Sequence, residues 1–118
     1  MNTINYTSIE QSDTLLKHGL SLETADMYYP NRADIKGDFA VPIELKHGNP
    51  LLSQEIPCWS VGALLEALPG SFSLFNDGAY WWCEWCGTDS DFIGFTTSEC
   101  NTAIEAVYKT VVWILENG

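Results

Sequence analysis

The sequence predicts an α+β fold, in which a three-stranded antiparallel meander packs against N-terminal, central and C-terminal helices. Helix-capping patterns occur near the start, in the middle and near the end of the chain, and the strand-like segments follow one another between the last two. Asp77-Gly78 separates two apolar runs, which is a strong short-range signal of a β-hairpin. Consecutive strands followed by a helix are typical of an antiparallel sheet with helices on one face. The 118 residues fit a single domain, 1–118.

The N-terminal helix is expected to begin at the capping box Thr7-Ser8-Ile9-Glu10. In this pattern the hydroxyl of Thr7 caps the first amides, and Glu10 at N3 reaches back to the N-cap. Gly19 is well suited to end the helix, because glycine readily adopts the left-handed conformation found just beyond helix ends.

A short second helix is predicted from Ser21, its N-cap, through Met27. It ends before Tyr29-Pro30, because the residue that precedes a proline avoids the helical conformation. Prolines and glycines punctuate residues 30–57, which we expect to form a long loop with one edge strand at Phe39–Leu45.

The central helix is predicted to span Val61–Leu68, with Ser60 as its N-cap and Pro69-Gly70 as its end. Short runs rich in aromatic residues come next, bounded by polar residues and glycines, which is typical of strands. The predicted strands are Ser71–Asn76, Ala79–Cys86 and Asp91–Thr96.

A two-residue turn at Asp77-Gly78 would pair Phe75 with Tyr80 across the hairpin. Because side chains alternate along a strand, one face then carries the residues expected in the core: Phe72, Leu74, Trp81, Cys83 and Trp85. The other face is partly solvated and carries Ser71, Ser73, Phe75, Tyr80, Trp82, Glu84 and Cys86. A three-residue turn that includes Asn76 would shift the pairing by one residue but keep the division of 79–86 between two faces.

The C-terminal helix begins at a capping box of Thr102 and Glu105 and runs to about Glu116. The stripe expected to face the core consists of Ile104, Val107, Tyr108, Val111 and Leu115. Trp113 lies on the opposite side, and a helix that is apolar nearly all round is usually buried on two sides. We expect the 30–57 loop, or a second copy of the chain in a homodimer, to cover that side.

The net charge of −11 argues against direct binding to nucleic acid, which needs a basic surface. It favours a solvated acidic surface or a basic protein partner attracted by the field of the chain. The longest apolar run, Val111–Leu115, is far too short to cross a membrane. The first residues do not resemble a signal peptide, so a cytoplasmic location with reduced thiols is expected.

Cys83 and Cys86 form a Cys-x-x-Cys pair, and Gly87 supplies the glycine that often follows such a pair in a zinc knuckle. On a regular strand, residues three apart point to opposite faces, so both thiolates could bind one metal ion only if the backbone turned there. A redox role is disfavoured, because no helix follows the pair and the neighbouring carboxylates would raise the thiol pKa.

No pattern in the sequence predicts an enzyme or a bound cofactor. His18 and His47 each stand beside a lysine in polar sequence, which is typical of solvent-facing turn residues. No serine lies in a nucleophile-elbow pattern, and no glycine-rich phosphate loop occurs.

Segments at both ends and in the middle of the chain carry a resemblance. They are Tyr6–Ser12 with Leu15-Leu16 and Gly19–Ser21, Pro57–Pro69, and Ala106–Tyr108 with Val111–Gly118. In these segments the chain resembles a group of small uncharacterised proteins from Bacteroides-type gut bacteria and their phages or mobile elements. The shared residues are helix caps, core stripes and helix ends, so the resemblance implies a biological setting and no mechanism.

We therefore expect a non-enzymatic accessory protein that binds another protein, with its acidic C-terminal half attracting a basic partner. Aromatic side chains rimmed by charge are common anchors of protein interfaces. The expected partner-binding residues are Phe75, Tyr80, Trp82 and Trp113. In a mobile-element setting, such a protein could neutralise a basic nuclease or DNA-binding protein of the host. The alternatives are a small zinc-binding domain that uses Cys83 and Cys86, or an enzyme with a pocket beneath the 30–57 loop.

Overall fold

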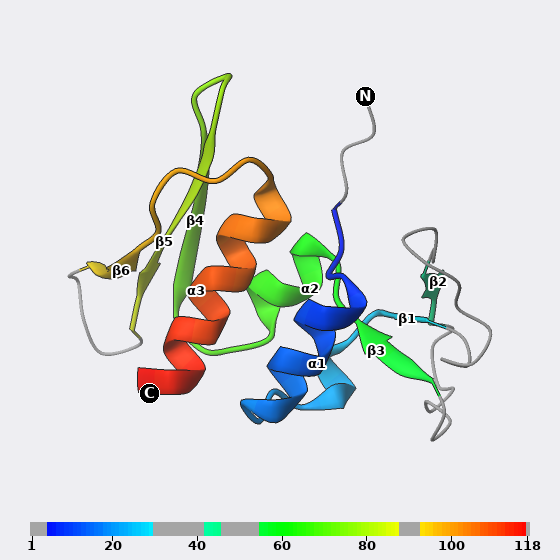
Figure 1. Cartoon of the computed structure of the whole chain (residues 1–118). Helices are drawn as coiled ribbons and strands as arrows, with labels where there is room; N and C mark the ends of the chain where they lie inside the picture. Colours follow the sequence, from blue (N-terminus) through cyan, green and yellow to red (C-terminus); the bar gives the residue numbers. More distant parts are fainter. Residues whose placement is uncertain (1–4, 30–41, 46–54, 88–92, 118) are drawn as a thin grey trace.

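The computed structural model describes residues 5–29, 42–45, 55–87 and 93–117. These residues form an α+β fold with two three-stranded antiparallel sheets and three α-helices (Figure 1). The predicted α+β class is confirmed, whereas the smaller of the two sheets was not expected. The long helix α3, Ala103–Asn117, lies between the larger sheet on one side and the helices α1 and α2 on the other.

Helix α1, Ile9–Lys17, begins one residue later than the sequence predicted. Ser8 is the N-cap, and its hydroxyl accepts the Gln11 N–H at 3.1 Å while the Gln11 side chain accepts the Ser8 N–H at 2.9 Å. The predicted cap, Thr7, is buried instead and accepts the Trp59 N–H at 3.1 Å. Because the Thr7 hydroxyl is hydrogen-bonded in the interior, it cannot cap the helix, and Ser8 forms the capping box instead. Gly19 follows the helix with φ +94°, as predicted.

The segment after α1 differs from the prediction. Ser21 does cap a helix, but this is a single 3-10 turn, η1, at Leu22–Thr24. Met27–Tyr29 is strand β1 rather than the end of a helix. It is the middle strand of the smaller sheet, between β2, Ile43–Glu44, and β3, Ile56–Cys58. Pairing in this sheet buries Tyr29. This tertiary contact outweighs the local helical propensity on which the prediction depended.

The region expected to be a long loop therefore contributes two short strands. Strand β2 lies within the predicted edge strand Phe39–Leu45 and is indeed at an edge of its sheet. The proline in β3, Pro57, is tolerated because β3 forms the other edge. Residues 30–41 and 46–54 lie outside the described part of the chain.

Helix α2, Val61–Glu66, begins after Ser60 as predicted but ends before Leu68. Ser60 is held from two sides. Its hydroxyl accepts the Ala63 N–H at 3.2 Å, and its own N–H and hydroxyl donate to the carboxylate of Asp26. The cap thus ties the start of α2 to the residue just before β1.

The larger sheet consists of β4, Ser71–Asn76, β5, Trp81–Cys86, and β6, Ile93–Thr96, in the order β4-β5-β6. Asn76 is opposite Trp81, so four residues connect the hairpin instead of the predicted two. The predicted pairing of Phe75 with Tyr80 is wrong, because Phe75 is opposite Trp82. A shift of two residues leaves every side chain on its predicted face.

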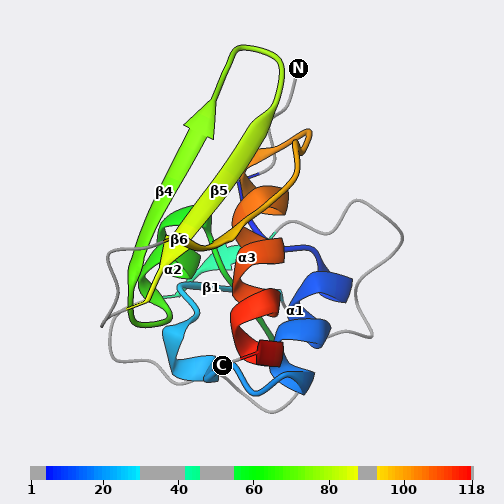
Figure 2. The same cartoon turned by 90° about the vertical axis from the view of Figure 1, so that its left-hand side faces the viewer.

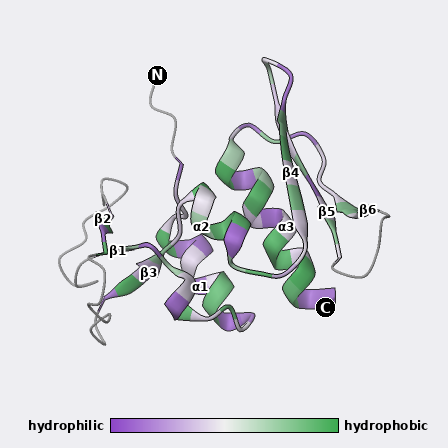
Figure 3. Ribbon diagram, turned by 180° about the vertical axis from the view of Figure 1, so that it is seen from behind, coloured by the Kyte–Doolittle hydropathy of each residue, from purple (hydrophilic) through white to green (hydrophobic). Residues whose placement is uncertain are grey.

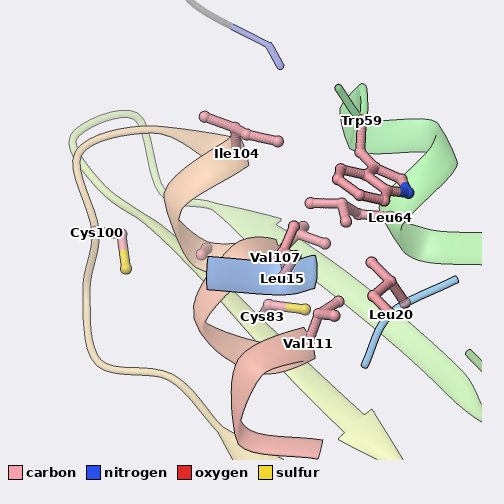
Figure 4. Close-up of a cluster of buried hydrophobic side chains, with 10 residues drawn as sticks. Leu15, Leu20, Trp59, Leu64, Cys83, Cys100, Ile104, Val107 and Val111 are labelled. Carbon is pink, nitrogen blue, oxygen red and sulfur yellow. The ribbon is translucent and has the colours of Figure 1, made fainter. Parts of the chain in front are cut away.

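The main core collects side chains from all three helices and the larger sheet (Figure 4). Its buried members include Leu15 of α1, Leu64 of α2, Cys83 of β5 and Val107 of α3. Of the residues assigned to the core face of the hairpin, Phe72, Leu74 and Trp81 pack against this cluster as expected. Hydrophobic residues dominate α3 in Figure 3, in keeping with its position between two layers.

The far side of α3 is covered by the larger sheet. Trp113 was expected to lie beneath the 30–57 loop or a second copy of the chain. Its ring instead stacks on Phe95 of β6, with centroids 4.7 Å apart. Among the described residues, β6, the closing strand of the sheet, covers the second apolar side of the helix.

Candidate protein-interaction surface

The face of the β4–β5 hairpin that points away from α3 carries a stacked aromatic pair. Phe75 and Trp82 are directly opposite in the ladder, and their ring centroids are 5.4 Å apart with an interplanar angle of 14°. Residues of the opposite parity, such as Leu74 and Cys83, pack into the core, so alternation directs this pair outward. In Figure 2 the hairpin lies in front of α3, with this outer face toward the viewer. We call Phe75 and Trp82 the outer aromatic pair.

The outer aromatic pair is only partly covered. Phe75 is 37% exposed and Trp82 is half-buried. Aromatic rings in sheets usually lose most of their contact with water. A stacked pair that stays partly exposed keeps a large, rigid apolar surface in place, and little side-chain entropy is lost when such a surface is bound. The pair therefore presents a fixed aromatic surface that is partly open to solvent.

Tyr80 extends the exposed aromatic surface at the same end of the hairpin, with 42% of its surface exposed. Its backbone position is set by Asp77, whose carboxylate accepts the N–H groups of Ala79 at 2.9 Å and Tyr80 at 2.7 Å. These hydrogen bonds from Tyr80 and Ala79 hold the pKa of Asp77 below its usual range. The tip of the hairpin is thus a defined structure rather than a loose loop.

Polar residues border the outer aromatic pair. The next row of the sheet places Ser73, Glu84 and Thr96 side by side across the three strands. Glu84 brings a carboxylate two residues along the strand from Trp82 on the same face. The outer face therefore combines aromatic surface with negative charge.

Trp113 does not belong to this surface. Besides stacking on Phe95, it lies 6.2 Å from the ring of Trp85, on the side of the sheet that faces α3. The Trp85 indole N–H donates to the Pro69 carbonyl at 3.1 Å, and a Cβ on Gly70 would clash with that nitrogen. This cluster packs α3 against β5 and β6. Phe95 was not among the predicted site residues, although its alternation with the exposed Thr96 is the pattern of a half-buried strand.

The two cysteines of the Cys-x-x-Cys pair lie on different faces of β5. The ladder with β4 is regular through both, with Leu74 opposite Cys83 and Ser71 opposite Cys86. Cys83 is fully buried, and burial raises the pKa of its thiol, whereas Cys86 is half-buried on the outer face. In this geometry the two sulfur atoms cannot ligate one metal ion. Within the described ranges, no group of three His, Cys, Asp or Glu side chains could hold a metal.

A groove of about 420 Å³ lies between η1 and the start of α2. It is lined by Thr24, Asp26, Ser60, Gly62, Ala63, Glu66 and Ala67. The polar groups at its base, Asp26 and Ser60, are engaged with one another in capping α2. The hydroxyl of Ser60 also accepts the Ala63 N–H, so both of these polar groups take part in the helix cap.

Of the two histidines, the described part of the chain includes His18. His18 lies at the end of α1, where its Nδ1 is 2.8 Å from the Thr14 carbonyl oxygen and its Nε2 is 3.3 Å from a carboxylate oxygen of Glu116. This contact joins the C-terminal ends of α1 and α3. His47, and any pocket formed by residues 30–41 or 46–54, lie outside the described residues.

Comparison of the chain with protein-family models, with curated proteins and with solved structures found no match. None of the helices in the described segments is both long and apolar enough to pass through a lipid bilayer. The outer face of the β4–β5 hairpin, with its partly exposed aromatic pair, is the candidate functional surface.

Proposed function

We propose that this chain is a non-enzymatic accessory protein that acts by binding another protein through the outer face of β4 and β5. The observation that carries the proposal is the outer aromatic pair, stacked in a fixed geometry and left partly open to solvent. Interfaces are enriched in aromatic residues at their centres, where a few such side chains supply most of the binding energy. Phe75 and Trp82 are the proposed anchors, with Tyr80 beside them.

The proposed partner is a basic protein. The chain carries 16 acidic and 5 basic residues, and Glu84 places one of the acidic groups on the outer face itself. A net charge of −11 attracts basic proteins over long range and accelerates their association. The same charge disfavours direct contact with nucleic acid.

The biological setting follows from the resemblance to small proteins of Bacteroides-type bacteria and their phages or mobile elements. In that setting the cytoplasm is the proposed location, and a host nuclease or DNA-binding protein is a partner of suitable charge. An acidic protein that covers such a target would act as an inhibitor, in the manner of an immunity protein or a DNA mimic.

Affinity capture from a Bacteroides-type host lysate with matched variants tests the proposal. Wild-type protein and Leu22→Ala should capture the same protein, because Leu22 is a 51% exposed residue on η1, away from the hairpin. Trp82→Ala should reduce capture at least about tenfold, as expected for an anchor residue. Raising the salt concentration should weaken capture by the wild type.

Circular dichroism and thermal unfolding of each variant would show whether the fold is retained. The proposal fails if Trp82→Ala captures as much partner as Leu22→Ala, or if the wild type retains nothing above background at low salt.

A further inference from the structure

Strand β4 is an edge strand with one unpaired side. In the described part of the chain, β5 is the strand that pairs with β4, and β4 stands at the end of the order β4-β5-β6. Its register with β5 runs without interruption from Ser71 to Asn76. Natural edge strands are usually protected by charged residues, prolines, bulges or short length. Over its six residues, Ser-Phe-Ser-Leu-Phe-Asn, β4 has none of these protections.

The hydrogen bonds on the other side of β5 identify the free backbone groups of β4. Trp81 exchanges both of its backbone hydrogen bonds with Cys100, at 2.8 and 2.7 Å, and the Cys83 carbonyl accepts from Thr97 at 2.9 Å. These residues of β5 therefore point their amides and carbonyls toward the side of β6 and the segment that follows it. In an antiparallel ladder the direction alternates, so the residues of β4 opposite them direct their backbone groups to the open edge. Asn76 is opposite Trp81 and Leu74 is opposite Cys83, and Phe72 follows in the same alternation.

The charge of the chain is unevenly distributed around this edge. Asp77 is the one charged residue in the whole stretch from Ala67 to Cys83, although the net charge of the chain is −11. Two copies of the chain repel each other over most of their surface and least along this strip. A basic partner, by contrast, would find no carboxylate on the edge strand itself and would be attracted to the outer face, where Glu84 of β5 lies. An uncharged edge with free hydrogen-bonding groups best fits an identical edge.

We propose that two copies of the chain pair through β4 in an antiparallel, two-fold symmetric arrangement. Residues directly opposite one another must share a face, and centring the axis at Ser73 meets this requirement. Phe72 of one copy then exchanges both backbone hydrogen bonds with Leu74 of the other, and the reverse pair repeats the contact. The side chains of Phe72 and Leu74 both pack toward the core in each copy, so they would meet on the same face of the combined sheet. The two sheets become one six-stranded sheet.

The dimer places two outer aromatic pairs on one continuous face. It does not depend on the proposed function, because it forms from this chain alone. It also differs from an association through α3, whose two sides are already covered by the larger sheet and by the helical layer.

Sedimentation velocity over a range of protein concentrations tests the dimer. Wild-type protein should shift from monomer to dimer as concentration rises, and more readily at high salt, because salt screens the repulsion between acidic copies. Ser73→Lys should weaken the dimer at least about tenfold, since two like charges would meet at the axis. Glu84 is the cross-strand neighbour of residue 73, so a lysine there is compatible with the monomer.

A charge-swap experiment separates loss of the contact from loss of the fold. Ser73→Glu alone should also be monomeric, but an equimolar mixture of Ser73→Lys and Ser73→Glu should form a heterodimer. Ser98→Lys, an exposed change in the connection between β6 and α3, should dimerise like the wild type. Amide exchange at Phe72 and Leu74 should slow as wild-type concentration rises.

A wild-type protein that stays monomeric up to about 1 mM would overturn the proposal, since pairing weaker than that has no meaning for an interface. It would also be overturned if Ser73→Lys dimerised like the wild type, or if the mixture of charged variants stayed monomeric. Capture of a protein partner by Phe75 and Trp82 would be unaffected by any of these results, so the two proposals fail separately.

Discussion

Burial sets the chemistry of three of the four cysteines. Cys58, Cys83 and Cys100 are buried, and burial raises the pKa of each thiol, that of Cys58 to about 11. At pH 8 a thiol with that pKa is about 0.1% thiolate, the reactive form. Cys86 is the half-buried exception on the outer face of β5.

We predict that a thiol-reactive dye modifies one cysteine rapidly in the native protein at pH 8. The fast phase should disappear in Cys86→Ser and persist in Cys58→Ser, which changes a buried residue. Unfolding in denaturant should expose all four thiols to rapid modification. If Cys83 and Cys86 reacted equally fast in the native protein, the result would contradict this geometry and support the Cys-x-x-Cys pair as a unit.

The tip of the hairpin should respond to acid through Asp77. Its pKa is lowered in the folded state by the amides of Tyr80 and Ala79, so its contribution is complete above the pKa of the unfolded chain. That contribution is lost as the pH falls through the lower, folded pKa. The amide resonances of Ala79 and Tyr80 should therefore titrate together at a pH below the usual range for an aspartate. In Asp77→Asn this step should be absent, and an unchanged titration would refute the role of the carboxylate.

The sequence predicted the faces of the hairpin better than its pairing. Alternation places Cys83 and Trp82 on opposite faces whatever the length of the turn. The observed register differs from the predicted one by an even number of residues, so the residues of β4 also keep their predicted faces. The four-residue connection arises because the side chain of Asp77 binds the following amides, a local contact that the Asp-Gly pattern does not reveal. The stacking of Phe75 on Trp82, the basis of the candidate site, depends on this register.

At the scale of elements, the starts of the helices were predictable because caps are local. Ser21, Ser60 and Thr102 each accept a backbone N–H at the expected position. The smaller sheet was not predictable, because its strands have only two or three residues and show no period. Its pairing of Met27 with Cys58 joins residues far apart in the chain.

The cap of α2 should contribute more to stability than the cap of α1. Ser60→Ala removes the helix cap and also leaves Asp26 without the hydroxyl that it binds, so we expect a loss of about 2 kcal/mol in the free energy of unfolding. Ser8→Ala removes a cap that has no carboxylate behind it, and about 1 kcal/mol is expected. Urea unfolding of both variants measures the difference. Equal losses would show that the link between Asp26 and Ser60 adds nothing.

At the scale of the whole molecule, α3 joins the layer of helices α1 and α2 to the larger sheet through a shared core. The cluster of buried side chains runs from Leu15 and Leu64 on the helical side, through Val107, to Cys83 in the larger sheet (Figure 4). With the core shared in this way, neither layer can bury its apolar face alone. The chain should therefore unfold in one cooperative step.

Leu64→Ala tests this cooperativity from the side of the molecule opposite the sheet. Leu64 is fully buried in α2, so its truncation should cost about 2 to 5 kcal/mol in the free energy of unfolding. The slowest amides of β5 should lose protection against hydrogen exchange by the same free energy, although none belongs to α2. Leu22→Ala, at an exposed position, should change stability by less than about 0.5 kcal/mol. If Leu64→Ala destabilised α2 while the protection of β5 stayed at its wild-type value, the two layers would be independent, and α3 would join them without coupling their unfolding.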